Sequence, residues 1–151
     1  MYEILKREEL NETVIRLVIN APRVAKKAQA GQFIILRTDE NGERIPLTVA
    51  DYDAEKGTVT IIFQVVGATT EKLNHLNEGD SLHDFVGPLG CKSDLIDESI
   101  EELKEKKMLF IAGGVGTAPV YPQVKWLHEQ GIDVDVIIGA RNKELIILEE
   151  E

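Results

Sequence analysis

The sequence is poor in cysteine, in basic residues and in long apolar runs. A single cysteine, Cys91, excludes a disulfide framework and a thiolate metal cluster within the chain. No apolar run is long enough to cross a membrane, and the N-terminus lacks the apolar core of a signal peptide. We therefore expect a cytoplasmic protein with no membrane partner. The 17 Lys and Arg residues against 27 Asp and Glu residues give a net charge of −10, which argues against a nucleic-acid partner.

What is present is typical of a globular chain. The 151 residues, of which 43% are apolar and 29% charged, are enough for one domain or two small ones. The histidines His75, His83 and His128 are scattered, with no pair at helical spacing and no serine or cysteine in a nucleophile's setting. We therefore expect neither a zinc site nor a hydrolytic triad.

Short β-type runs follow one another before residue 92. They are rich in β-branched residues, and Asn41-Gly42 is a strong hairpin signal. The regular spacing of runs and turns predicts a small all-β antiparallel barrel. A helix that Thr69 or Thr70 can cap, and that Gly79 ends, interrupts it. The expected strands span residues 13–19, 32–37 and 58–66.

The pattern changes after the barrel. Residues 107–112 predict a strand buried on both faces, residues 118–130 a helix with Pro119 in its first turn, and residues 132–138 a second strand. This β-α-β order is typical of an α/β domain with a parallel sheet. We divide the chain into a barrel (1–92), an amphipathic linker helix (93–106) and the N-terminal part of an α/β domain (107–151).

Three segments carry candidate chemistry. In Arg44-Ile45-Pro46-Leu47-Thr48, the arginine offers five donors to a pyrophosphate, and Pro46 fixes the backbone so that Thr48 can face a ring nitrogen. On these residues alone, a surface arginine beside a proline bulge is the favoured alternative. Gly67-Ala68-Thr69-Thr70 is either an anion site at a helix start or an ordinary cap, and the cap is favoured.

The third segment, Gly113 to Pro119, is more specific. Its small residues lie between a strand and a helix, where backbone amides can approach a dinucleotide diphosphate. Pro119 occupies the place of the third glycine of a Rossmann fingerprint, so a Rossmann dehydrogenase is the poorer interpretation. A merely tight turn is the alternative. Gly87-Pro88-Leu89-Gly90 predicts a tight turn that ends the barrel, whose backbone a flat ring could approach.

Together these motifs resemble the ferredoxin–NADP⁺ reductase superfamily over the whole chain. Within it, the sequence is similar to ferredoxin–NADP⁺ reductase subunit alpha (sulfide dehydrogenase subunit beta) and to the electron-transfer subunit of dihydroorotate dehydrogenase B. The motifs occur in the family's order: Arg44 to Asp51, Phe63 to Gly67 with Thr69 and Thr70, Gly87 to Gly90, Gly113 to Pro119, and Gly139 to Arg141.

The resemblance implies an FAD-binding barrel followed by an NAD(P)-binding α/β domain, with Thr48 in a catalytic role. Arg141 could meet a 2′-phosphate or line the adenosine side, and no acid is placed to accept from a ribose 2′-hydroxyl. The subunits that the chain resembles are often the NAD(H) side of a larger complex, so the resemblance favours NAD(H). The implied flavin contacts are Arg44, Ile45, Pro46, Leu47, Thr48, Phe63, Gln64 and Val65, with Gly67, Thr69 and Thr70 on the pyrophosphate. The implied nicotinamide-cofactor contacts are Gly113, Gly114, Val115, Gly116, Thr117, Ala118 and Pro119.

The implied activity is that of a flavoprotein oxidoreductase subunit in electron transport. A hydride would pass between NAD(P)H and FAD, and electrons would pass to a larger flavoprotein, an iron–sulfur catalytic subunit or ferredoxin. A non-catalytic flavin or nucleotide module that scaffolds a complex or senses redox state is the alternative. Longer family members end in a cysteine cluster that holds a [2Fe–2S] centre, whose ligands this sequence lacks. We expect a chain truncated at its C-terminus or completed by a partner, with weakened nicotinamide binding and no iron–sulfur exit.

Overall fold

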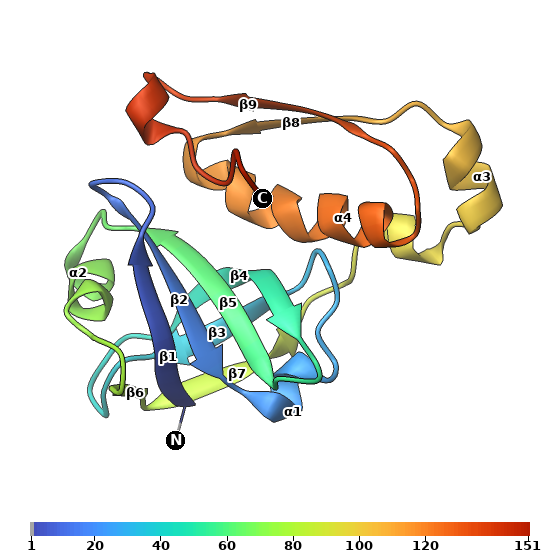
Figure 1. Cartoon of the computed structure of the whole chain (residues 1–151). Coiled ribbons are helices and arrows are strands. Elements are labelled where there is room, and N and C mark those ends of the chain that lie inside the picture. Colours follow the sequence, from blue (N-terminus) through green and yellow to red (C-terminus); the bar gives the residue numbers. More distant parts are fainter. Residues whose placement is uncertain (1) are drawn as a thin grey trace.

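The computed structural model describes residues 2–151, which form two lobes packed on each other (Figure 1). The first lobe is a nearly closed antiparallel barrel of seven strands in the order β6-β1-β2-β5-β4-β3-β7. Its elements are β1 (Tyr2–Glu9), β2 (Val14–Asn20), α1 (Pro22–Ala25), β3 (Phe33–Arg37), β4 (Ile45–Asp53), β5 (Thr58–Gln64), α2 (Ala68–Asn74), β6 (Ser81–Leu82) and β7 (Asp84–Leu89).

The predicted antiparallel barrel is confirmed. The three expected strands are β2, β3 and β5, and β3 and β4 form the hairpin that Asn41-Gly42 indicates, although their connection runs over residues 38–44. The sequence patterns missed β1, in which Ile4 is the one fully buried residue and charged residues predominate. Such a strand shows little alternation of apolar and polar positions, so its pairing with β2 decides its structure.

The barrel core lies between the strands. In β5, Val59, Ile61 and Phe63 point inward and are almost completely buried. The fourth apolar residue, Ile62, points outward and is nonetheless buried, because the second lobe covers it. The outer face of β5 is therefore part of the interface between the two lobes. The largest side chains buried in the core are Ile4, Leu17, Ile19, Ile34, Leu36, Ile61, Phe63, Leu73, Leu82 and Phe85.

The second lobe is a parallel pair of strands covered on one face by a helix. Helix α4 lies between the barrel and the sheet (Figure 1). Its Thr117–Glu129 span matches the helix expected at 118–130, and Gly131 (φ +72°) follows its end. The elements are η1 (Asp94–Asp97), α3 (Ile100–Glu105), β8 (Leu109–Gly113), η2 (Gly114–Gly116), α4, β9 (Asp135–Gly139) and η3 (Lys143–Leu145).

Two expectations for this lobe are wrong. The single linker helix is two short helices, because Glu98 is extended and Ser99 begins a new helix by accepting a hydrogen bond from the Glu102 amide. Strand β8 is buried on one face only: Ala112 is buried beneath α4, but Leu109 and Ile111 are 55% and 72% exposed. After β9, the chain forms only the short 3-10 helix η3.

Candidate functional site

The alternation of β4 divides the Arg44 to Thr48 motif between two faces of the strand. Ile45 and Leu47 point inward and pack against the barrel core. Arg44 and Pro46 lie exposed on the outer face, where Thr48 is half-buried. The prediction that Ile45 and Leu47 contact a flavin is thus not supported for their side chains, since a strand that closes a barrel must bury every second residue.

Arg44 lies close to the start of α2. Its side chain is 63% exposed, and its Nη2 atom lies 3.4 Å from Asp84 Oδ2. Its neighbour Glu43 accepts a hydrogen bond of 2.5 Å from the Thr69 hydroxyl. The two segments that the sequence suggested as anion sites, far apart in the chain, therefore meet in space.

Helix α2 begins at the N-cap residue Gly67, to which Thr70, the third residue of the helix, reaches back. Thr70 Oγ1 accepts from the amides of Val66 (2.9 Å) and Gly67 (3.0 Å) and donates to the Gly67 carbonyl. Neither threonine is the N-cap residue, but Thr70 satisfies the backbone amides that precede the helix. Gly67 has extended backbone, and a Cβ atom there would meet nothing within 4 Å. Packing within the chain does not require a glycine at this position, so the space beside it is open to a ligand.

The end of β5 presents one polar residue to the second lobe. Phe63 is 2% exposed and lies in the barrel core, so its side chain is not available to a flavin. Gln64 is exposed and Val65 half-buried. The Gln64 side chain donates to Thr13 Oγ1 at 3.4 Å, which places it beside the loop between β1 and β2.

The Gly113 to Pro119 segment joins β8 to α4. A Cβ atom at Gly114 or Gly116 would meet nothing within 4 Å, and Gly114 has φ +53°. Thr117 and Ala118 are buried, and Ala118 packs against the barrel. The Ala118 side chain thus faces protein, so any contact of this residue with a cofactor would be through its backbone. The backbone of the turn remains open, as a dinucleotide diphosphate would require.

A groove of about 790 Å³ brings five predicted residues together between the lobes. These five are Gln64 of the barrel, Gly113, Gly114 and Val115 of the glycine turn, and Arg141 after the end of β9. The sequence missed its other wall, the loop 11–14, in which Asn11 Oδ1 accepts from the Thr13 and Val14 amides at 3.0 Å. An Asx turn is readable there, but nothing in the sequence places it opposite the glycines.

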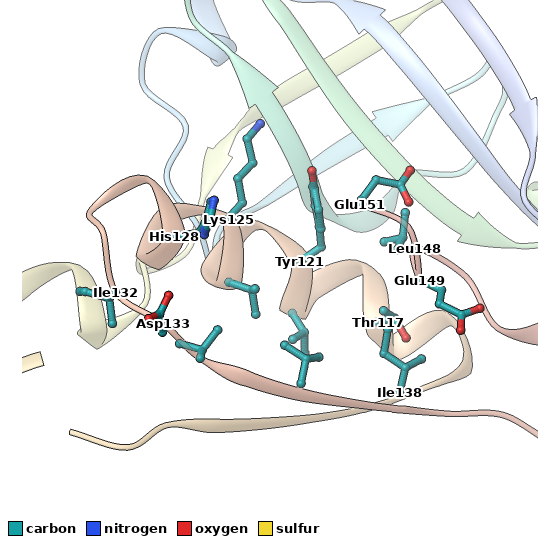
Figure 2. A pocket seen from close by; sticks show the side chains of 14 residues that line it. Thr117, Tyr121, Lys125, His128, Ile132, Asp133, Ile138, Leu148, Glu149 and Glu151 are labelled. Atoms are coloured by element: carbon teal, nitrogen blue, oxygen red, sulfur yellow. The ribbon is translucent and has the colours of Figure 1, made fainter. Parts of the chain in front are cut away.

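A second hollow, of about 410 Å³, lies between α4, β9 and residues 148–151 (Figure 2). Of the predicted site residues it includes only Thr117, whose buried hydroxyl has no hydrogen-bond partner among the described residues. Its walls are mostly apolar side chains of α4 and β9. We place the candidate site in the groove, because backbone donors and predicted residues converge there.

Gly87 to Gly90 does not form the expected turn. Gly87 to Leu89 belong to β7, and Gly90 follows it. A Cβ atom at Gly87 would lie 2.6 Å from Ile34 Cγ2, and one at Gly90, which has φ +75°, would lie 2.8 Å from the Phe33 ring. Close packing against β3 therefore explains both glycines.

The two lobes are joined by apolar and polar contacts. Val14, Ala50 and Ile62 of the barrel pack against Ala118 and Ile147. Beside this cluster, Lys125 Nζ lies 2.7 Å from Asp51 Oδ1. Burial opposes the charge of Lys125, but the hydrogen bond and charge of Asp51 outweigh it and raise the pKa of Lys125. The strand that carries Thr48 is thus held against the helix that follows the glycine turn.

Within residues 2–151, no three His, Cys, Asp or Glu side chains are grouped so that they could hold a metal ion. Cys91 is exposed. In the same part of the chain, no helix has the length and apolar character needed to span a membrane.

Comparison with known proteins identifies relatives along the entire chain. It is 63% identical over 151 residues to an uncharacterized protein in the adh 3′ region of Clostridium beijerinckii, of which it covers 51%. It is 41% identical over 149 residues to a Thermotoga maritima homologue of the electron transfer subunit of dihydroorotate dehydrogenase B (NAD⁺), covering 99% of this chain and 50% of that protein. The chain thus spans about half the length of the curated relatives it matches. No protein-family model matches it.

Solved structures agree with these relatives. The NADH-dependent reduced ferredoxin–NADP oxidoreductase, whose structure gave insights into flavin-based electron bifurcation, superposes with a TM-score of 0.88 at 41% identity, over 99% of this chain and 52% of that one. A ferredoxin–NADP⁺ reductase of Plasmodium falciparum shares the fold at 16% identity (TM-score 0.78; 98% and 61% covered). The chain is therefore a homologue of the electron-transfer subunits of dihydroorotate dehydrogenase B and has the fold of the ferredoxin–NADP⁺ reductase superfamily.

Proposed function

We propose that this chain is a flavin-dependent electron-transfer subunit that moves a hydride between NAD(P)H and FAD and passes electrons to a partner. One observation carries the proposal: the open glycine turn and the outer face of β4 are packed on each other through Ala118 and Ala50. Two cofactor sites built on these elements would be neighbours. The names of the relatives, which include electron transfer subunits, support the same class.

The residues of the barrel fit a flavin with a diphosphate. Bound FAD would supply the ring that accepts a hydride and releases electrons. The exposed Arg44 guanidinium would donate to the diphosphate, and the Thr69 hydroxyl lies on the same side, beside Glu43. The empty space at Gly67 lets backbone approach the phosphates. Thr48, on the outer face of β4, would hold its hydroxyl toward a ring nitrogen.

The residues of the second lobe fit a dinucleotide. Gly114 and Gly116 leave the backbone uncovered directly before α4, a helix of 13 residues whose N-terminus favours negative charge. Arg141, two residues after the end of β9, lines the same groove and would face the adenosine side or a 2′-phosphate. We propose NAD(H) as the preferred cofactor.

The electron acceptor would be a larger flavoprotein, an iron–sulfur catalytic subunit or ferredoxin. Since the chain covers about half of its relatives, the full activity and partners of those proteins are part of this proposal. Within residues 2–151, no three His, Cys, Asp or Glu side chains are grouped so that they could hold a metal. A [2Fe–2S] centre would therefore require ligands from outside these residues. The alternative function, a flavin or nucleotide module without catalysis, remains an outcome of the experiment below.

The experiment is anaerobic absorbance spectroscopy of the purified chain with FAD, followed by NADH and then NADPH. We expect a bound flavin spectrum that NADH bleaches faster than NADPH. Bound flavin that neither nucleotide bleaches would support the non-catalytic module. If the chain fails to bind FAD, the flavin site on β4 and α2 is refuted.

A further inference from the structure

Strand β4 contains a bulge between its flavin motif and the second lobe. Val49 pairs with Ile61 of β5, but Asp51 pairs with Thr60, so β4 has one extra residue, Ala50. Such an insertion shifts the alternation of every residue that follows it. Before the bulge Val49 points into the core, and after it Tyr52 packs against the core.

The shift turns Asp51 outward. In a regular strand Asp51 would share the inward face of Val49, where a carboxylate would be buried in the apolar core. In the bulged strand, Ala50 is 1% exposed and belongs to the apolar cluster between the lobes, and Asp51 faces α4. The Tyr52 amide donates to Asp51 Oδ1 at 2.8 Å, so the carboxylate is held in one direction.

Helix α4 offers the complementary charge. Lys125 and Tyr121 both point from α4 toward the barrel (Figure 2). Lys125 Nζ donates to Asp51 Oδ1 at 2.7 Å, and each of the two side chains is about one third exposed. Further along the same interface, the Ser93 hydroxyl donates to Gln123 Oε1 at 2.8 Å.

The Asp51–Lys125 pair lies where it can influence the orientation of the glycine turn. Apolar contact between Ala50 and Ala118 is non-directional and does not by itself fix the rotation of α4. Lys125 lies nine residues after Gly116, which is about 13 Å along the helix. A bond of fixed direction at that distance from the turn restricts the rotation of the helix, and with it the orientation of the turn relative to β4.

We infer that Asp51 and Lys125 are positioning residues that set the orientation of the nicotinamide site relative to the flavin site. This inference rests on the proposed function. Neither side chain would touch a reacting atom; their role would be to keep the two rings at the separation and angle that hydride transfer needs. Rates of oriented reactions are sensitive to displacements of about 1 Å, whereas a partly exposed ion pair contributes little to stability.

The first test is single-turnover reduction of the FAD-loaded chain by NADH in Lys125→Met and Asp51→Asn. We expect the limiting rate to fall about tenfold or more, while the affinities for FAD and NADH change less than about twofold. Lys125→Arg should restore most of the rate, and the double variant should be no slower than either single one. The matched control is Lys104→Met, an exposed lysine of α3.

Wild-type rates in Lys125→Met, or a loss of rate matched by an equal loss of FAD binding, would overturn the inference. If the wild-type chain binds no FAD or is not reduced by NADH, the proposed function fails instead. The inference is then decided by a second measurement without cofactors. Spin labels at Glu55→Cys and Lys143→Cys, exposed positions on the two lobes, report the distance between them in a Cys91→Ser background. We expect a broader distance distribution in Lys125→Met than in Lys104→Met; equal distributions would refute the inference.

Discussion

The Thr69 hydroxyl donates to Glu43 Oε2 at 2.5 Å, so a carboxylate lies at the helix start where the proposed site requires a diphosphate. A diphosphate beside Arg44 and Thr69 would have to displace Glu43 or bear its repulsion. The contact joins residue 43 to residue 69 and is invisible in the sequence.

Glu43→Gln should therefore bind FAD more tightly than the wild type does, by about three- to tenfold, since removing one like charge near the surface is worth about 1 kcal/mol. Titration with FAD, followed by fluorescence quenching, measures the affinity. Riboflavin, which has no phosphate, should bind both proteins equally. Glu40→Gln, in the same loop, is the control. Equal FAD affinity in Glu43→Gln and the wild type would contradict the prediction.

Gly116→Ala should block the nicotinamide site without harming the fold. Its φ of −63° suits alanine, and the new Cβ atom would meet nothing within 4 Å. We expect the melting temperature to stay the same or rise slightly, and the affinity for NAD⁺ to fall at least about tenfold, because the methyl group would occupy the space of a ligand. Calorimetric titration with NAD⁺ measures the affinity. Gly67→Ala should instead weaken FAD and leave NAD⁺ unchanged, so each variant is the control for the other.

Phe63→Ala should destabilise the barrel by about 3–5 kcal/mol, since it removes a fully buried aromatic ring from the core. Urea unfolding followed by circular dichroism measures the loss. Val66→Ala, two residues after β5 and 76% exposed, should change the free energy of unfolding by less than about 0.5 kcal/mol. A small effect of Phe63→Ala on stability would show that this ring is not a core residue.

Alkaline pH should destabilise the chain through groups at the lobe interface. Burial, together with the charge of Asp51, raises the pKa of Tyr121 above its ordinary value of 10.0. The pKa of Lys125 is likewise raised. Groups whose pKa is raised on folding hold their protons more tightly in the folded chain, so their stabilisation is complete at neutral pH. It is lost as the pH rises above about 10 and through the folded-state pKa values.

The urea midpoint should accordingly be flat near neutral pH and fall from about pH 10 upward. Tyr121→Phe, which has no phenolic proton, should show a smaller fall over the same range. An identical alkaline slope in the wild type and Tyr121→Phe would rule out a contribution from this residue.

Several features could be predicted from local patterns. β-Branched runs indicated β2, β3 and β5, and the change from an apolar run through glycines to a helical pattern indicated β8 and α4. These patterns work because strand and helix periodicity are properties of neighbouring residues. The same reasoning joined residues 93–106 into one helix, because apolar spacing does not show that Glu98 and Ser99 break it.

The sequence by itself determined the kinds of elements, their order and the open glycine turn, because these depend on residues close together in the chain. Only the tertiary structure decided which motif residues face a ligand. Closing the barrel placed Phe63 in the core and packed Ile45 and Leu47 against it. The bulge at Ala50 turned Asp51 outward to Lys125, 74 residues away. Both outcomes depend on strand register and lobe packing, which arise from contacts between distant segments and leave no local pattern.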